Sequence, residues 1–459
     1  MKDNILFKDA SNSLIKLTNL LQTLIKGSVF ENKVCYVGGC IRDLILGNEP
    51  KNIDIVVNKE NGGIELAHFL AMRLGIEAEG NIDIVSSQYG ASLEISNDKE
   101  LSDYYIRMTQ TCNSRYQDET RTPNEIFGTF EEDALRRDFT INALYWNISQ
   151  EALYDFTRKG LDDLKNKIIR CPYSPSLLFY EDPSRIVRAV RFSNEKGWGI
   201  ESETWLGMIE NCSELMSCDF VDELVEVLLL DNPTNAMRRL YHCGALDYMV
   251  PDVYDLCSST DINGKNLFEE TLKVLKDTTT NIVSRLAALF HRTDEIIKTS
   301  SPNFAASVAK ADVKALGFSD MTAEKVSKAI LNHKKFDNYG NGVMPTDRIM
   351  KKFINRCGNA IYEVIDLMNA SYMNRDDVDK NKPRWVLMKV QEINKSESGK
   401  KTVELPINGT DIMREFNLKK GPHIGILLNV VKDAVTDNPK ISKDECFNLV
   451  RDKIHTLSF

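Results

Sequence analysis

The amino-acid sequence predicts the α+β fold class, with a mixed β-sheet and its helices first and an all-α region after it. One observation is that residues 33–147 alternate between the two-residue hydrophobic period of strands and the longer period of helices. Another is that the helical period prevails from about residue 155 almost to the end. A third is size, because 459 residues with 42% hydrophobic content can form a large core, and this length suggests about three domains.

The individual elements follow from the same periods. Residues 1–30 have the leucine spacing of an amphipathic helix. The polar stretch NKSESGKK at 394–401 has the composition of a linker, and a short helical module follows at 405–454. Strands are expected near 34–37, 53–57, 82–86, 91–95, 103–111 and 141–147. Helices are expected, among others, at 182–196, 219–230, 233–244, 279–291, 323–333 and 359–373.

Composition excludes several classes of protein. The ten cysteines lack CxxC pairs and zinc-site spacing, so we expect reduced thiols and no disulfide framework. The first residues, MKDNILFKDASNS, lack the basic-then-apolar order of a signal peptide. No apolar run approaches the roughly 18 residues that a membrane-spanning helix needs. We therefore expect a cytoplasmic protein with no membrane partner.

The charge distribution is uneven. With a net charge of −9, the protein can bind nucleic acid only where basic residues are concentrated. Such a concentration spans residues 136–191, although a solvated helix face would have the same composition. Its basic residues are Arg136, Arg137, Arg158, Lys159, Lys165, Lys167, Arg170, Arg185, Arg188 and Arg191.

A glycine pair and the strand after it carry the first chemical signal. Gly38 and Gly39 lie between an expected strand and a helix, where glycine lets the backbone approach a phosphate. An ordinary turn is the alternative interpretation. The next strand carries Asn52 and Asp54 at i and i+2, so their side chains share one face. Two carboxylates at this spacing would hold divalent cations for nucleotide chemistry, whereas this strand offers an amide and a carboxylate.

Two longer stretches are more specific, EEDALRRDFTINALYWN at 131–147 and EDPSRIVRAVRF at 181–192. In the second stretch, Asp182 and Arg185 lie three residues apart on one helix face. A carboxylate accepts hydrogen bonds and a guanidinium donates them, so this pair can present a fixed edge to a nucleobase. A surface ion pair is the alternative.

These motifs resemble class II tRNA nucleotidyltransferases, the CCA-adding enzymes and their bacterial poly(A) polymerase relatives. The glycine pair, RDLILG, RRDFTINAL, DFT..GLDDL, EDPSRIVRAVRF and NAMRRLYHCGALDYMVPD arrive in the family's order. LPINGTDIMREFNLKKGPHIG at 405–425 resembles the C-terminal module of the branch that carries an HD-type domain. The resemblance covers roughly residues 30–450.

The resemblance implies a domain order. An N-terminal helix at 1–30 precedes a nucleotidyltransferase head at 31–154, which contains the mixed sheet. A neck and body at 155–255 would supply the nucleotide-reading and RNA-binding helices. A degenerate HD-like helical domain at 256–393 and a helical tail module at 402–459 complete the order.

The resemblance also implies an activity. The 3′-hydroxyl of a tRNA would attack the α-phosphate of CTP or ATP in line, adding CMP or AMP without a nucleic acid template, with Mg²⁺ as cofactor. The implied catalytic residues are Asn52, Asp54 and Arg137, with Asp54 as the metal ligand and Asp155 at a hinge. The implied nucleotide-binding residues are Gly38, Gly39, Arg42, Arg136, Asp138, Asn142, Asp182, Arg185, Arg188 and Arg191.

The chain departs from the family at the metal site. The first metal-binding acid falls on Asn52, and Mg²⁺ strongly favours anionic oxygen over an amide. Counting back from Tyr116 places the third acid at Arg107, with Asp103 as the nearest substitute on the same strand. Asn52 in place of an aspartate therefore predicts a weakened Mg²⁺ site.

The HD-like region departs as well. An HD-type metal site needs adjacent His and Asp, further histidines and a distant Asp, whereas this chain has His291-Arg292, an isolated His333 and Ser371 at the corresponding positions. We expect structural roles for both histidines.

Two functional hypotheses remain. The first is a tRNA 3′-end nucleotidyltransferase with a weakened metal site. The second is a catalytically impaired pseudoenzyme that binds tRNA or another structured RNA as a scaffold or sensor. The missing acids favour the second hypothesis, whereas the family resemblance and the nucleotide-reading helix favour the first. We adopt the first hypothesis, a nucleotidyltransferase.

Overall fold

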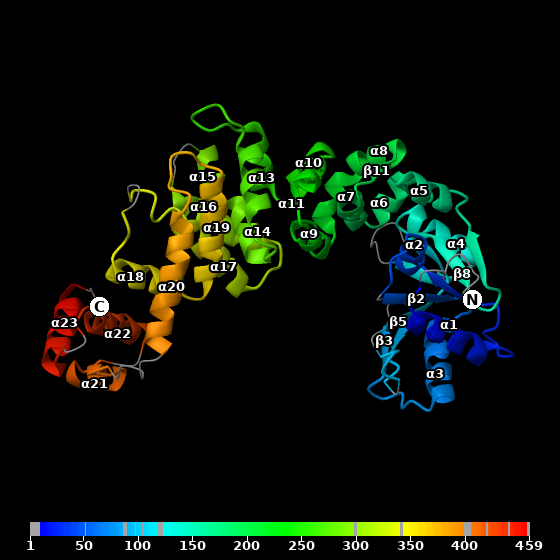
Figure 1. The fold of residues 1–459 in the computed structure, drawn as a ribbon, viewed down its shortest axis with the longest axis horizontal. Coiled ribbons are helices and arrows are strands. Elements are labelled where there is room, and N and C mark those ends of the chain that lie inside the picture. The colour runs from blue at the N-terminus through cyan, green and yellow to red at the C-terminus, as the bar shows by residue number, and fades with distance from the viewer. Residues whose placement is uncertain are drawn as a thin grey trace. The chain divides into compact units, whose positions relative to one another are not determined.

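The computed structural model describes residues 10–50, 52–85, 90–96, 98–102, 104–116, 123–297, 301–339, 343–398, 405–418, 421–438 and 441–456 (Figure 1). The chain divides into two compact units, residues 1–323 and 324–459. A mixed sheet with helices comes first and a mostly helical region follows, which confirms the predicted fold class. The finer division at residues 154/155, 255/256 and 393/402 stays a prediction.

The N-terminal part of the first unit holds the sheet and its helices. Its elements are α1 (Asn12–Ile25), β1 (Val34–Val37), α2 (Gly39–Ile45), β2 (Asn52–Val57), α3 (Gly62–Leu74), β3 (Ile82–Val85), β4 (Gly90–Leu93), β5 (Tyr105–Gln110), β6 (Cys112–Tyr116), β7 (Pro123–Phe127), α4 (Phe130–Leu135), η3 (Thr140–Asn142), β8 (Leu144–Asn147) and β9 (Ala152–Asp155).

The remainder of the first unit is largely helical. Its elements are α5 (Gly160–Asn166), β10 (Ile168–Ile169), α6 (Pro175–Glu181), α7 (Ser184–Lys196), β11 (Gly199–Ile200), α8 (Ser202–Asn211), η4 (Cys212–Ser217), α9 (Val221–Leu228), α10 (Thr234–His242), α11 (Ala245–Met249), α12 (Pro251–Tyr254), η5 (Asp255–Ser258), α13 (Leu267–Asp277), α14 (Ile282–Phe290), α15 (Thr293–Ile296) and α16 (Pro302–Ala315).

The second unit is helical. The boundary between the units falls within α17 (Asp320–Asn332). The later elements are α18 (Asp347–Cys357), η6 (Gly358–Ala360), α19 (Ile361–Met373), α20 (Lys382–Ser398), α21 (Gly409–Glu415), α22 (Pro422–Asp437) and α23 (Lys443–Thr456).

The main sheet has the strand order β3-β4-β5-β2-β1-β8-β9, in which β2 and β5 run parallel. Side chains alternate along β2 as the sequence predicts: Ile53 and Ile55 are buried, whereas Asn52 is exposed and Asp54 is half-buried. Helix α3 packs against β4 and β5. A Cβ at Gly63 would lie 2.5 Å from a backbone oxygen of β5, so glycine permits this close approach. The face of β2 that carries Asn52 and Asp54 is therefore available for a functional site.

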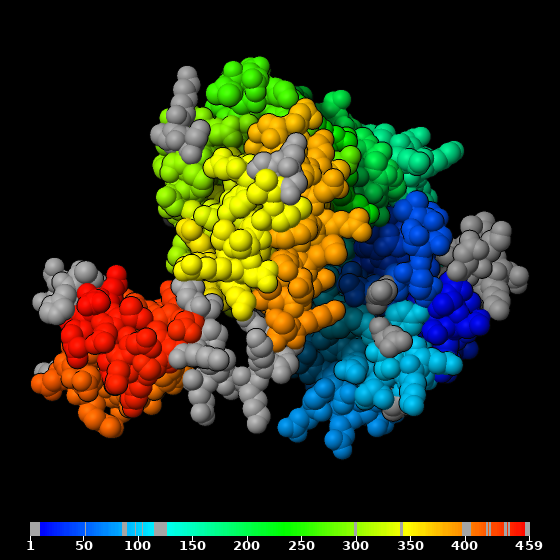
Figure 2. Space-filling view, turned by 60° about the vertical axis from the view of Figure 1, so that its left-hand side comes forward, coloured from blue at the N-terminus to red at the C-terminus, as the bar shows by residue number. Residues whose placement is uncertain are grey.

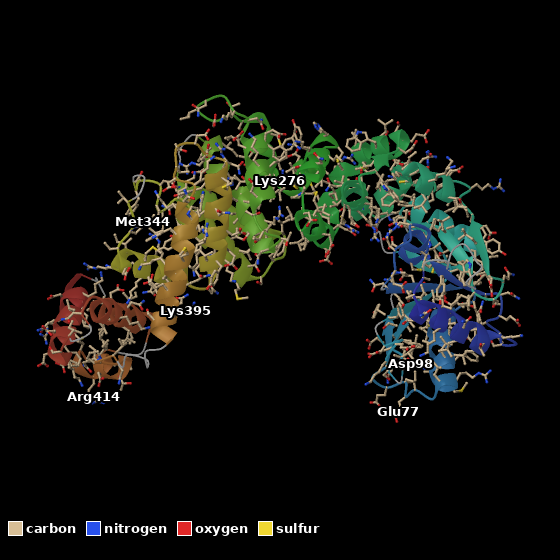
Figure 3. All side chains as sticks on the ribbon, in the orientation of Figure 1. Glu77, Asp98, Lys276, Met344, Lys395 and Arg414 are labelled. Carbon is tan, nitrogen blue, oxygen red and sulfur yellow. The ribbon has the colours of Figure 1, made fainter. Side chains whose placement is uncertain are left out.

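Helix α1 begins at Asn12, with the hydroxyl of Ser11 accepting a hydrogen bond from the backbone N–H of Leu14. Residues 1–9 of the predicted N-terminal helix lie outside the described residues. The ammonium of Lys16 lies 2.7 Å from a carboxylate oxygen of Asp98, which links α1 to the segment between β4 and β5 (Asp98 is labelled in Figure 3).

Three sequence expectations need correction. Residues 394–398 of the predicted linker belong to α20, because the chain has no glycine there before Gly399; residues 399–401 lie outside the described part. The strand expected at 141–147 begins only at Leu144, since residues 140–142 form a 3₁₀ turn. The β6–β7 hairpin was absent from the predicted strands because its residues lack a clear alternation.

The tail module has a hydrophobic core of its own. Its buried members from α21, α22, α23 and the preceding segment are Ile407, Ile412, Ile424, Leu427, Val431, Val435, Cys446 and Val450. Figure 2 shows these elements as one compact body in orange and red. A separate core is what the predicted module at 402–459 requires, although its boundary stays a prediction.

Both histidines of the HD-like region are buried. The Nδ1 atom of His291 lies 2.7 Å from the carbonyl oxygen of Ala288, and His333 makes the same contact with Ile330. Burial lowers the pKa of His333 to about 3, so its ring is neutral. Among the described residues no cluster of three or more His, Cys, Asp or Glu could hold a metal, and no helix has the length and apolarity to cross a bilayer.

Candidate functional site

The polar face of β2 meets an arginine from β5. The parallel register pairs Asp54 with Arg107, and the guanidinium places Nη2 2.9 Å and Nε 3.0 Å from Oδ1 of Asp54. Both side chains reach solvent, with exposed fractions of 48% for Arg107 and 30% for Asp54. Sequence spacing assigns the family's third acid to Arg107, so a cation lies beside Asp54 where another carboxylate would be expected.

A cavity of about 160 Å³ opens beside this ion pair. A Cβ at Gly38, where φ is +77°, would lie 3.6 Å from Oδ2 of Asp54 and 3.8 Å from a guanidinium nitrogen of Arg137. Glycine at this turn therefore keeps the backbone close to both charged groups. Three guanidiniums and one carboxylate make the cavity suitable for an anion. Its lining residues are Val37, Asp54, Ile55, Arg107, Thr109, Arg136 and Arg137.

Two of these arginines are fixed by Asp133, which has no exposed surface. Its two carboxylate oxygens lie 3.0 Å from Nη2 of Arg136 and 2.8 Å from Nη2 of Arg137. Tyr145 donates its hydroxyl hydrogen to Asp133, and Arg137 donates to the Tyr145 oxygen over 2.8 Å. Burial opposes the ionisation of Asp133, but the charges of Arg137 and Arg136 outweigh it and lower its pKa. The carboxylate of Asp133 thus forms ion pairs with the guanidiniums of both Arg136 and Arg137.

A second set of contacts runs from α2 to η3. Arg42 donates a hydrogen bond of 2.8 Å to the amide oxygen of Asn142 and also pairs with the neighbouring Asp43. The amide nitrogen of Asn142 donates to both carboxylate oxygens of Asp138 over 3.1 Å. The predicted nucleotide-binding residues Arg42, Asn142 and Asp138 are therefore brought together, with their polar groups directed at one another.

The contacts continue from η3 to the helices α7 and α9. Nε of Arg188 lies 2.9 Å from Asp138, and Nη1 lies 3.2 Å from Glu223 of α9. Glu223 also accepts a hydrogen bond of 2.7 Å from Arg191. Burial raises the pKa of Asp138, but Arg188 and Asn142 reverse this effect, so the pKa is lowered overall. The charges of Arg188 and Arg191, both predicted to bind nucleotide, are thus compensated within the protein.

Asp182 and Arg185 form an ion pair, but Asp182 precedes α7 (Ser184–Lys196), so the prediction that both lie on one helix face is wrong. Nε of Arg185 lies 3.4 Å from Oδ2 of Asp182, and the Asp182 side chain is 42% exposed. The other oxygen, Oδ1, accepts hydrogen bonds from the backbone N–H and the hydroxyl of Ser184. Asp182 therefore binds the first residue of α7 while keeping an exposed edge. Both the structural and the base-reading interpretation are compatible with this geometry.

Asp155, the predicted hinge residue, follows the last strand of the sheet. It accepts a hydrogen bond of 2.7 Å from the Thr157 hydroxyl and one of 3.0 Å from the backbone N–H of Leu161. These bonds connect β9 to the first turn of α5. The hinge role stays a prediction.

The basic stretch at 136–191 divides into two groups. Its arginines at 136, 137, 170, 185, 188 and 191 pair with carboxylates, as the preceding contacts and the Arg170–Asp163 pair show. The exposed basic residues around α5 are Arg158, Lys159, Lys165 and Lys167. The second group is the more exposed of the two, although the Arg188 side chain in the first is 42% exposed. Exposed cations are what contact with a nucleic acid backbone requires.

Sequence reasoning missed the carboxylates that organise the site. Asp133 precedes Arg136 and Arg137 by three and four residues, and this helical spacing could have identified it. Glu223 lies 32 residues beyond Arg191, and no local pattern indicates their contact.

The residues at this site do not fit a two-metal centre. Asn52 is exposed and offers only a neutral amide oxygen, while Oδ1 of Asp54 is held by Arg107. Asp103, the substitute that the sequence offers, lies outside the described residues. A divalent cation needs anionic oxygen ligands, and a guanidinium at the same carboxylate repels it.

Comparison with known proteins finds relatives of this chain. Residues 34–170 match the family described as the poly A polymerase head domain. Over 92% of this chain and 92% of the relative, the sequence is 26% identical to the tRNA nucleotidyltransferase cca1 of Schizosaccharomyces pombe. These likenesses support the class II tRNA nucleotidyltransferase and poly(A) polymerase family, to which the sequence motifs point. Its nucleotidyltransferases generally depend on a divalent metal.

Sequence identity is higher over a shorter part of the chain. The mitochondrial CCA tRNA nucleotidyltransferase of Candida glabrata is 35% identical, but over only 36% of this chain and 32% of the relative. A solved complex of a CCA-adding enzyme with ATP aligns over 99% of this chain and 98% of that chain, with 20% identity and a TM-score of 0.63. This last likeness concerns the fold. Membership of the HD-type branch stays a prediction.

Proposed function

We propose that this chain is a tRNA 3′-end nucleotidyltransferase that adds CMP or AMP from CTP or ATP without a nucleic acid template. The observation that carries the proposal is the cavity beside the turn at Gly38. Its lining includes Asp54 and the three arginines Arg107, Arg136 and Arg137. An arginine cluster suits a triphosphate. The relatives are tRNA nucleotidyltransferases, which supports tRNA as the acceptor.

The roles within the reaction follow from this arrangement. Arg136 and Arg137 hold the phosphates of the incoming nucleotide, because Asp133 fixes both guanidiniums at the cavity. The 3′-hydroxyl oxygen attacks the α-phosphorus in line, the bond to the β-phosphate breaks, and pyrophosphate leaves. Asp54 is the carboxylate among the described lining residues, so it is placed to accept the hydroxyl proton.

Base and RNA recognition belong to the helices that follow the head. The exposed edge of Asp182 with Arg185 is proposed to read cytosine or adenine. Exposed basic residues around α5, represented by Lys159 and Lys165, are proposed to contact the tRNA backbone. The proposal includes a cytoplasmic location, which cell fractionation would test.

A second candidate is an RNA-binding protein without transfer activity. The contact between Arg107 and Asp54 favours it, because the guanidinium occupies an oxygen that the reaction would use. Mg²⁺ coordination by Asp54 is proposed only as an accessory to the first candidate, since the site as described lacks a second carboxylate.

One extension assay distinguishes the candidates. Purified protein is incubated with tRNA lacking its 3′ end, labelled CTP and ATP, and either Mg²⁺ or Mn²⁺. Asp54→Ala should lower the extension rate about 100-fold, because the only acid of the described cavity lining is removed.

The control is Asp83→Ala, which removes an exposed aspartate from the same sheet and should change the rate less than about twofold. If wild type binds the tRNA but extends it with neither metal, the second candidate replaces the first.

A further inference from the structure

The face shared by β2 and β5 has an unusual charge for a nucleotidyl-transfer site. Asn52 is neutral, while Asp54 and Arg107 carry opposite charges, so their formal charges sum to zero. Three carboxylates at these positions would repel a triphosphate strongly and would need bound cations to receive it. The substitutions in this chain remove that repulsion without any metal.

Arg107 has the geometry to contact a phosphate. It uses Nε and Nη2 to hold Asp54, but a guanidinium carries five N–H donors in a fixed fork. Its side chain is 48% exposed and lines the cavity, so further N–H groups are accessible to a ligand there. Asp54 keeps the guanidinium in place by the same contact.

The remaining cationic groups of the cavity are also fixed. Arg136 and Arg137 share the buried carboxylate of Asp133, which holds both guanidiniums at the cavity wall. Together with Arg107 they place three guanidiniums around one small polar volume. A polyphosphate is the anion that matches several guanidiniums at once.

We propose that Arg107 takes the place of a divalent cation at this site, so that the chain binds the phosphates of a nucleoside triphosphate without a divalent metal. The identity of the ligand rests on the proposed function, whereas the independence from metal rests on Arg107 and Asn52. The inference concerns binding, and it does not depend on how fast the nucleotide is transferred.

The test is equilibrium binding of ATP to the full-length protein by calorimetry, once in EDTA and once with Mg²⁺. The Kd of wild type should differ less than about threefold between the two conditions. Arg107→Gln should weaken binding in EDTA about tenfold, since one cationic contact is lost. Arg107→Glu should weaken it about 100-fold in EDTA and recover part of the affinity when Mg²⁺ is added.

Arg73→Gln is the matched control, because Arg73 is an exposed arginine at the end of α3 and does not line the cavity. It should leave the Kd unchanged in both conditions. Inorganic tripolyphosphate should compete with ATP in EDTA, which separates phosphate contacts from base contacts. Arg107 is on the exposed face of β5, so its variants should melt within a few degrees of wild type, as circular dichroism would verify.

The inference is overturned if wild type loses ATP binding in EDTA, or if Arg107→Gln binds ATP as wild type does. Failure of the proposed function would look different, because wild type would then bind ATP in EDTA and yet extend no tRNA. The binding and extension measurements therefore judge the two proposals separately.

Discussion

The same five residues, NIDIV, occur at 52–56 and at 81–85, and the two copies have different surroundings. Both form strands, β2 and β3. The first strand lies inside the sheet between β1 and β5, whereas the second lies at its edge beside β4. Opposite Asp54 the register places Arg107, and opposite Asp83 it places Ser92. The same local sequence thus supplies a candidate catalytic carboxylate, Asp54, in β2 and an exposed edge residue, Asp83, in β3.

The difference shows what a strand motif can indicate by itself. Alternation of Ile with polar residues specifies a strand and the face of each side chain. It specifies neither the neighbouring strand nor the residue that meets the aspartate. The chemistry of Asp54 depends on Arg107 and on the cavity, both supplied by segments outside the motif.

The largest expected difference between the copies is in stability. At the fourth position of each copy, Ile55 is 1% exposed and Ile84 is 56% exposed. Ile55→Ala should therefore lower the free energy of unfolding by about 3 kcal/mol, whereas Ile84→Ala should lower it by less than about 0.5 kcal/mol. Urea unfolding followed by circular dichroism measures both. Equal losses for the two variants would contradict the burial of β2.

A smaller difference, in the rate of tRNA extension, is expected when the asparagine that begins each NIDIV segment is replaced by aspartate. Asn52→Asp restores a second anionic oxygen on the face of Asp54 and should raise Mg²⁺-dependent tRNA extension about tenfold. Asn81→Asp makes the same change beside Asp83 and should have no effect. Labelled-nucleotide extension assays at several Mg²⁺ concentrations measure the response. An unchanged rate for Asn52→Asp would show that Asn52 does not limit the site.

The smallest expected effect is on the pH dependence of stability, at Asp312, whose carboxylate lies beside that of Asp252 and not beside a cation. Burial, together with the charge of Asp252, raises the pKa of Asp312 in α16 to about 7. Because this exceeds the unfolded value of about 3.9, the folded state binds more protons between about pH 4 and pH 7. Stability attributable to Asp312 is therefore present at low pH and is lost as the pH rises through about 7.

Asp312→Asn should remove this loss and stabilise the protein at pH 8 by about 1 kcal/mol, a value reduced for the partial exposure of the group. Asp83→Asn, at an exposed aspartate, should leave the pH dependence unchanged. Urea unfolding at pH 5 and pH 8 compares the variants. A pH dependence in Asp312→Asn equal to that of wild type would contradict the contact with Asp252.

Sequence reasoning was most successful where the structure is local. The α+β order, the shared face of Asn52 and Asp54, the pairing of Asp182 with Arg185 and the glycine turn at Gly38 all follow from patterns within a few residues. The family motifs are likewise contiguous, and the family assignment is confirmed. Positions of helix and strand ends were less accurate, as the extension of α20 to Ser398 shows.

Only the tertiary structure decided which charges meet. Asp54 and Arg107 are separated by 53 residues, and their contact requires the parallel pairing of β2 with β5. Glu223 neutralises Arg188 and Arg191 across two helices, which a sequence pattern cannot encode. Electrostatic interactions depend on distance in space, and strand register and helix packing set that distance. The sequence by itself therefore determined the family and the type of each side chain, while the fold determined that an arginine stands beside its central aspartate.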